Sequence, residues 1–191
     1  HLNKGWVLNA LGDYPQALTV LTKASDLDPA NPWIYIHRAG AHMMLGNFQQ
    51  AFLDTEKAIR MDATIAYAYA VRGWAYSGLG NLHNALADLN KSAQMDPRNP
   101  IVYIFRAWVQ NGLGNKQPAS DDFAKSFALA PNNSIVLWNL AAFHALGGEK
   151  EKSLLALGKA VRINGALKKL ARTNACFQSL WNDADFRKLV E

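Results

Sequence analysis

Several side chains that could do chemistry gather in one short stretch of the sequence, "HRAGAHMMLGNFQQAFLDTEKAI", which begins at His37. Histidine, arginine and aspartate are residue types that hold metals, move protons or bind anions. Arg38 and Asp54 lie eight residues either side of Gly46, so a helical hairpin turning at this glycine would bring them to the same height. That geometry fits a small active site and a structural ion pair equally well.

The same arginine and aspartate recur along the chain, which favours the structural interpretation. Two further copies follow at intervals of 34 residues, Arg72 with Asp88 and Arg106 with Asp122. Two corresponding places hold neither residue, Lys4 with Val20 and Leu140 with Ala156. The two residues are therefore present or absent together, and either one alone would be a poorly compensated buried charge. We interpret the pairs Arg38–Asp54, Arg72–Asp88 and Arg106–Asp122 as ion pairs that join the two helices of a hairpin.

The histidines do not form a metal site by their spacing. His37 and His42 are five residues apart, which places them about 140° apart around a helix and prevents them from sharing an ion. His42 and His144 fall at equivalent places on an inward face of the repeat. There we expect core histidines whose ring nitrogens are hydrogen-bonded within the protein. No nucleophile and base in a recognisable order, and no paired carboxylates, indicate catalysis. The sequence therefore predicts no enzyme activity, no metal and no cofactor.

A period of 34 residues runs through most of the chain. Five glycines follow it, at Gly12, Gly46, Gly80, Gly114 and Gly148, and five lysines, at Lys23, Lys57, Lys91, Lys125 and Lys159. A glycine suits the left-handed position after a helix, where a side chain would clash. The residues after the first four glycines, Asp13, Asn47, Asn81 and Asn115, are expected to cap the next helix. Each unit is thus predicted to be a helical hairpin that must stack on its neighbours to bury its apolar face.

This pattern resembles the tetratricopeptide repeat (TPR) family, whose units are hairpins of the same length. The stretch "LGDYPQALTVLTKASDLDP" carries the family's Leu-Gly, Tyr, Ala and Pro marks. The resemblance implies an all-α solenoid, wound as a right-handed superhelix, over residues 1–167. We place the five units at 1–31, 32–65, 66–99, 100–133 and 134–167, with the first truncated at its start. Residues 168–191 leave the period and are expected to form a C-terminal helical cap, with Asp183 as an N-cap, similar to those of bacterial TPR proteins.

Most of the six tryptophans fall on one stripe of the repeat. Residues at the second, fifth and ninth positions of each unit lie on a side of the first helix that faces away from its own hairpin. In the TPR family these positions line a concave groove that receives an extended peptide or a partner helix. The resemblance therefore implies a largely apolar binding groove. The residues expected there are Trp6, Trp33, Ile36, Met43, Tyr67, Trp74, Ile104, Trp108, Asn111, Trp138 and Asn139.

The tryptophans of this predicted groove have an alternative role. They could only fill the space that Gly40, Gly78 and Gly112 leave on adjoining helices. Some family members instead clamp a C-terminal carboxylate with lysine, arginine and asparagine on this surface. Here the matching places hold Leu2, Trp6, His37, Tyr67 and Val71, so that clamp is missing.

The bulk composition excludes some classes of partner. The net charge of +5 is concentrated near the C-terminus, and no basic stripe runs along the repeats, so we expect no nucleic-acid binding. No apolar run is long enough to insert into a membrane. The start lacks an initiator methionine and a signal peptide, so we expect a processed or excised piece. The single cysteine leaves the compartment open, with the cytoplasm favoured.

The sequence thus predicts a non-catalytic scaffold that binds a protein or peptide in a tryptophan-rich groove. One alternative is a structural module that self-associates by stacking its apolar ends head to tail. Another is the regulatory arm of a larger enzyme.

Overall fold

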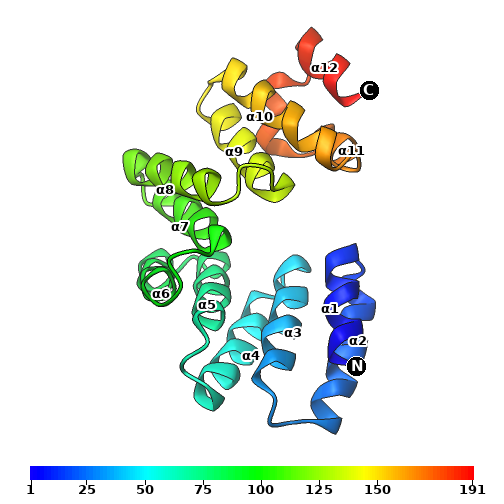
Figure 1. Ribbon diagram of the computed structural model, residues 1–191, viewed down its shortest axis with the longest axis vertical. Helices are drawn as coiled ribbons and strands as arrows, with labels where there is room; N and C mark the ends of the chain where they lie inside the picture. Colours follow the sequence, from blue (N-terminus) through cyan, green and yellow to red (C-terminus); the bar gives the residue numbers. More distant parts are fainter. The chain divides into compact units, whose positions relative to one another are not determined.

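The structure is a computed structural model that describes residues 1–191. Its contacts divide the chain into two compact units, residues 1–119 and 120–191, which are described separately. Only helices and turns occur (Figure 1), so the prediction of an all-α fold is confirmed. The helices are α1 (Leu2–Leu11), α2 (Tyr14–Leu27), α3 (Pro32–Met44), α4 (Phe48–Met61), α5 (Ala66–Gly78), α6 (Leu82–Met95), α7 (Pro100–Gly112), α8 (Lys116–Leu129), α9 (Ser134–Leu146), α10 (Lys150–Ile163), α11 (Leu167–Ala171), the 3-10 helix η1 (Ala175–Leu180) and α12 (Ala184–Val190).

The helices pack as consecutive hairpins, as the 34-residue period predicts. Within residues 1–119, α1 packs on α2, α3 on α4, and α5 on α6, and each hairpin also contacts the next. We call α1, α3, α5 and α7 the A helices, and α2, α4 and α6 the B helices. The A helices form a row, because α1 contacts α3, α3 contacts α5, and α5 contacts α7 (Figure 1). One face of this unit is therefore built from A helices alone.

The turn inside each hairpin depends on glycine. All five periodic glycines have φ between +74° and +82°, a region that other residues rarely adopt. At the second turn the Gly46 amide donates to the Met43 carbonyl at 3.0 Å, and the Asn47 amide donates to the His42 carbonyl at 2.8 Å. These bonds satisfy carbonyls that the end of α3 would otherwise leave without partners.

The capping residues differ in part from the prediction. Asp13 does cap α2, accepting a bond from the Gln16 amide at 3.2 Å. Asn47 and Asn81 stand at the equivalent places before α4 and α6, but their side chains make no cap hydrogen bond. The asparagine caps stand instead before the A helices. Asn31, with ψ of 108°, accepts from the Trp33 amide at 3.1 Å.

Small residues allow the two helices of a hairpin to approach closely. Ala17, Ala51 and Ala85 lie in the first turn of the B helices and are fully buried. Gly73 on α5 faces α6 so closely that an added Cβ would lie 2.8 Å from Leu89 Cγ and 3.0 Å from the Ala85 carbonyl oxygen. The core between the helices is therefore packed without room for a larger side chain at this crossing.

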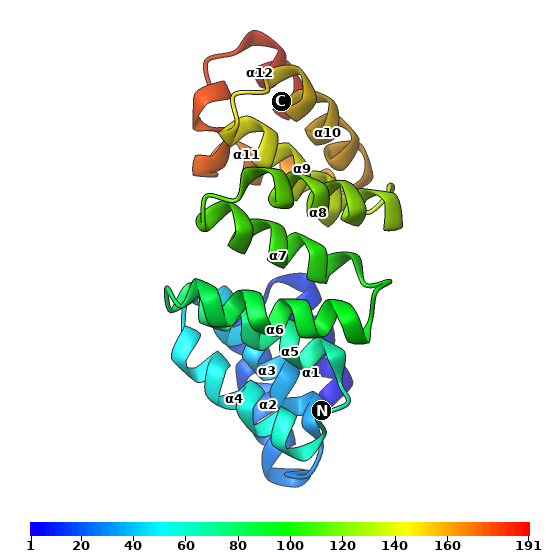
Figure 2. The ribbon, with the colours of Figure 1, turned by 90° about the vertical axis from the view of Figure 1, so that its left-hand side faces the viewer.

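Residues after α10 cover the last hairpin, α9 with α10. The 3-10 helix η1 contacts α9, while α11 and α12 contact α10 (Figures 1 and 2). Phe177 and Phe186 are buried beneath this segment at 0% and 1% exposure. Asp183 caps α12, accepting from the Phe186 amide at 3.1 Å, and its other carboxylate oxygen pairs with Lys150 on α10 at 2.5 Å. These contacts hold the segment against the last hairpin. None of the helices combines the length and the apolar character needed to span a membrane.

Candidate partner-binding surface

The arginine and aspartate of the opening stretch form a two-pronged ion pair. Arg38 Nε donates to Asp54 Oδ2 at 2.8 Å, and Arg38 Nη2 donates to Asp54 Oδ1 at 2.6 Å. Arg72 and Asp88 repeat this arrangement at 2.6 and 2.8 Å. Both aspartates are buried at 7% exposure, and the hydrogen bond to Asp54 raises the pKa of Arg38. Each pair joins an A helix to its own B helix.

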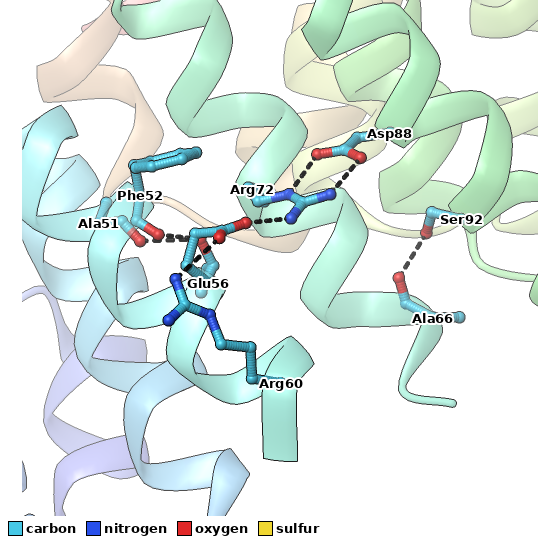
Figure 3. Close-up of polar contacts among 9 residues, drawn as sticks. Ala51, Phe52, Glu56, Arg60, Ala66, Arg72, Asp88 and Ser92 are labelled. Carbon is cyan, nitrogen blue, oxygen red and sulfur yellow. Dashed lines mark hydrogen bonds and ion pairs between the residues drawn. The ribbon is translucent and has the colours of Figure 1, made fainter. Parts of the chain in front are cut away.

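Each arginine also reaches the preceding hairpin, which the sequence did not reveal. Arg72 Nη1 donates to Glu56 on α4, so this guanidinium joins α4, α5 and α6 (Figure 3). Arg38 Nη1 donates to Ser25 Oγ on α2 at 3.0 Å. Arg106 Nη1 donates to Asn90 Oδ1 on α6 at 2.9 Å. The third partner changes in residue type from one hairpin to the next, so no repeated pair of residues pointed to it.

The pair Arg106–Asp122 stays a prediction. Arg106 belongs to the unit 1–119 and Asp122 to the unit 120–191, and the two units are described separately.

The periodic lysines also have a structural role. Lys57 Nζ lies 4.2 Å from the ring centre of Tyr35, and Lys91 Nζ lies 4.0 Å from that of Tyr69. The guanidinium of Arg38 lies 5.3 Å from the same Tyr35 ring. A buried tyrosine in each of these hairpins thus packs between two cations, an arrangement that stabilises both. The recurring lysine belongs to the scaffold.

The histidines singled out in the sequence differ in their surroundings. Burial lowers the pKa of His37 and of His42, so both are neutral at neutral pH. The Nδ1 atom of His42 is buried without a hydrogen-bond partner, so the expectation of a satisfied histidine is wrong at this position. His144 Nδ1 does have one, Glu149 Oε2 at 2.5 Å. No group of three or more histidine, cysteine or acidic residues is placed to hold a metal ion.

Aromatic side chains lie along the row of A helices. Trp6 on α1 and Trp33 on α3 are 56% and 41% exposed, unusually high for tryptophan. Trp74 on α5 is half-buried and stacks on Phe105 of α7, with ring centres 4.8 Å apart and planes inclined by 17°. We call Trp6, Trp33, Trp74 and Phe105 the aromatic surface. Sequence reasoning missed Phe105, which belongs to this surface because its ring stacks on Trp74.

The structure places the other predicted groove residues differently. Ile36 and Ile104 are 1% and 2% exposed, so they contact the core and are not available to a ligand. Met43 and Tyr67 are partly buried and pack against the core, and burial raises the pKa of Tyr67. The remaining residues predicted to line the groove are all half-buried: Trp108, Asn111, Trp138 and Asn139.

In the unit 120–191, two of the predicted residues already have protein contacts. Trp138 packs edge-on against Phe177 of the cap, with ring centres 5.0 Å apart. The Asn139 amide donates to the Ile135 carbonyl of its own helix at 2.8 Å. These contacts explain both residues without a ligand, so we keep the aromatic surface to the unit 1–119.

The tryptophans do not fill the space left by glycines. A Cβ at Gly78 would overlap the ring of Phe48, and one at Gly112 would lie 3.3 Å from Leu82 Cδ1. Phe48 and Leu82 both come from the start of a preceding B helix. At Gly40 the nearest side-chain atom is the Asn9 amide nitrogen, at 4.0 Å. The side chains nearest to these glycines are therefore Phe48, Leu82 and Asn9, and the space-filling alternative finds no support here.

Comparison with known proteins gives two partial matches to family models. A model described as "TPR repeat" matches residues 5–46, and one described as "Tetratricopeptide repeat" matches residues 66–99. No curated protein matches the chain significantly.

Solved structures resemble the chain over most of its length. TTC0263, a thermophilic TPR protein of Thermus thermophilus, is 21% identical with a TM-score of 0.79, covering 100% of this chain and 97% of that one. YrrB, a TPR protein described as having an unusual peptide-binding site, is 20% identical with a TM-score of 0.53, covering 86% and 84%. The first TPR of Spaghetti (RPAP3), solved with the HSP90 peptide SRMEEVD, is 28% identical with a TM-score of 0.54, covering 59% and 89%.

Proposed function

Because the chain belongs to the tetratricopeptide repeat family, we propose that it is a scaffold whose protein partner lies along the aromatic surface of its A helices. TPR proteins generally mediate protein–protein interactions, and the fold is typically non-catalytic. Two of the similar structures, those of Spaghetti and YrrB, are described with a bound peptide or a peptide-binding site. This likeness supports a peptide or an extended segment as the partner here.

The observation that carries this proposal is the exposure of Trp6 and Trp33. Exposed apolar side chains that form a contiguous patch on one face mark interaction sites. Tryptophan is also the residue type most enriched among those that dominate binding energy at interfaces. Because α1 and α3 pack on each other, these two rings stand on neighbouring helices of one face. One ligand that crosses the A helices could contact both.

A peptide selection tests the proposal. Displayed random peptides would be selected on the full chain, and the best binders measured by titration against variants. We expect Trp6→Ala and Trp33→Ala each to weaken binding by at least about tenfold. Leu53→Ala is a matched control, because Leu53 is 57% exposed but lies on a B helix. Binders that are lost with Leu53→Ala and kept in the tryptophan variants would place the binding site elsewhere and refute the proposal.

A further inference from the structure

We propose that the aromatic surface recognises an uncharged, proline-rich segment in the polyproline II conformation. This inference rests on the proposed function and adds the chemistry of the partner. Three properties of the surface carry it: the lack of charge, the exposed aromatic rings, and the indole donors that have no acceptor within the protein.

The first property is the lack of charge on the A helices. The helices α1, α3, α5 and α7 contain no aspartate or glutamate. Of their cations, Arg38 and Arg72 are held in ion pairs with B-helix aspartates. Lys4 is two residues from Trp6, which places it about 160° away around α1. Arg106 is likewise engaged by Asn90.

A ligand charge would therefore find no counterpart on this surface. His37, the titratable group next to the Trp33 ring at 6.1 Å between ring centres, has its pKa lowered by burial and is neutral. A charged ligand side chain would lose water here without gaining an ion pair, which is unfavourable. The surface thus disfavours acidic, phosphorylated and strongly basic segments.

The second property is the supply of flat aromatic rings. The rings of Trp6 and Trp33 are open to water, and Trp74 with Phe105 forms a stacked pair on the next two A helices. Grooves lined by aromatic rings are the common receptors for proline-rich segments, since the rigid polyproline II helix loses little entropy on binding. Uncharged aromatic surfaces also accept amphipathic helices, so this property alone does not choose between the two ligands.

The third property makes that choice. The indole N–H groups of Trp6, Trp33 and Trp74 donate to no protein acceptor, whereas that of Trp181 donates to the Ala171 carbonyl at 3.2 Å. A polyproline II segment leaves its carbonyls free, and its prolines bring no N–H of their own. A helical ligand has bonded most of its carbonyls internally. Three free donors on an uncharged aromatic surface therefore complement a proline-rich ligand better than a helix.

Decaproline with acetylated and amidated ends is the probe for this proposal. Titration into the full chain, followed by calorimetry and tryptophan emission, is expected to show saturable binding. Trp6→Ala should weaken it by at least about tenfold. Trp6→Phe keeps an aromatic ring but removes the donor, and should weaken it by a smaller factor. Leu53→Ala, on a B helix, should leave the affinity unchanged. Decaproline with two glutamates in place of prolines should bind at least about tenfold more weakly, because its charges find no partner.

Two results would overturn the inference. One is tighter binding of an uncharged amphipathic helix-forming peptide than of decaproline. The other is decaproline affinity that is the same in the wild-type chain and in Trp6→Ala, or no decaproline binding at all. In either case the proposed function still stands if peptides from the random selection depend on Trp6 and Trp33. The proposed function itself is refuted only if no selected peptide depends on Trp6 and Trp33 for its binding.

Discussion

Replacing Arg72 by leucine should destabilise the chain strongly, because it leaves a buried carboxylate without a partner. Arg72 makes two hydrogen bonds with Asp88, at 2.6 and 2.8 Å, and a third with Glu56. Asp88 is only 7% exposed, so water cannot replace these bonds. Removing one partner of a buried ion pair costs about 3 to 5 kcal/mol. We expect Arg72→Leu to lower the free energy of unfolding by about that amount.

Removing both charges should cost less than removing one. The double variant Arg72→Leu with Asp88→Ala copies the residues that the fifth unit carries in these places, Leu140 and Ala156. No charge is then left buried between the helices, and the loss should fall to about 1 to 2 kcal/mol. Glu56→Gln should cost at most about 1 kcal/mol, because the Glu56 side chain is 24% exposed and glutamine still offers an acceptor.

Urea unfolding of the full chain, followed by circular dichroism, measures these differences. The double-mutant cycle for Arg72 and Asp88 should give a coupling energy of about 2 kcal/mol. A coupling energy near zero, or a loss in Arg72→Leu no larger than in the double variant, would show that burial of the lone aspartate is not the dominant cost. The explanation for their joint presence and absence along the chain would then be refuted.

Three further predictions concern packing, pH and the cap. Gly73→Ala should destabilise by about 1 to 3 kcal/mol despite the better helix propensity of alanine, because the new Cβ would lie 2.8 Å from Leu89 Cγ; unchanged urea midpoints would contradict this. Burial lowers the pKa of His37 and His42, so as pH falls below 6.5 the unfolded chain binds protons before the folded chain does. The free energy of unfolding should therefore fall between about pH 7 and pH 5, and His37→Gln with His42→Gln should flatten that slope in urea melts at each pH. Phe177→Ala should cost about 3 to 5 kcal/mol and expose the last hairpin, seen as a lower melting temperature and aggregation in light scattering; a monomeric variant with an unchanged melt would show that the cap is dispensable.

The sequence predicted the hairpins and their internal contacts because these depend on residues that recur. Glycine with positive φ at each turn is one example, and the Arg38–Asp54 pair is another. Both involve two residues of one 34-residue unit, so each copy of the pattern tests the interpretation again. The contact from Arg72 to Glu56 crosses between units and changes its residue type along the chain. Such a contact leaves no repeated signal, and only the packing of successive hairpins reveals it.

The candidate site could be predicted only in part for a similar reason. Periodicity fixes which side of a helix a residue lies on, but not how far the next hairpin covers that side. Ile36 and Trp33 were placed on the same stripe, yet the first is 1% and the second 41% exposed. Phe105 escaped notice because no other A helix carries phenylalanine, tyrosine or tryptophan at this position in the unit, which is held by Asn3, His37 and Val71.

Arg38 and Arg72 each join three helices, and these bonds also determine how far a local opening of the chain can spread. In a repeat protein, each hairpin gains most of its stability from its two neighbours, so the strength of the junctions determines whether hairpins open singly or together. Arg38 crosses the junction between the first and second hairpins, and Arg72 crosses the next one. Opening one hairpin would break charged bonds on both of its borders. Amide protons of α2 through α6 should therefore exchange with solvent as one cooperative block, at a common free energy, with faster exchange confined to the ends of the array.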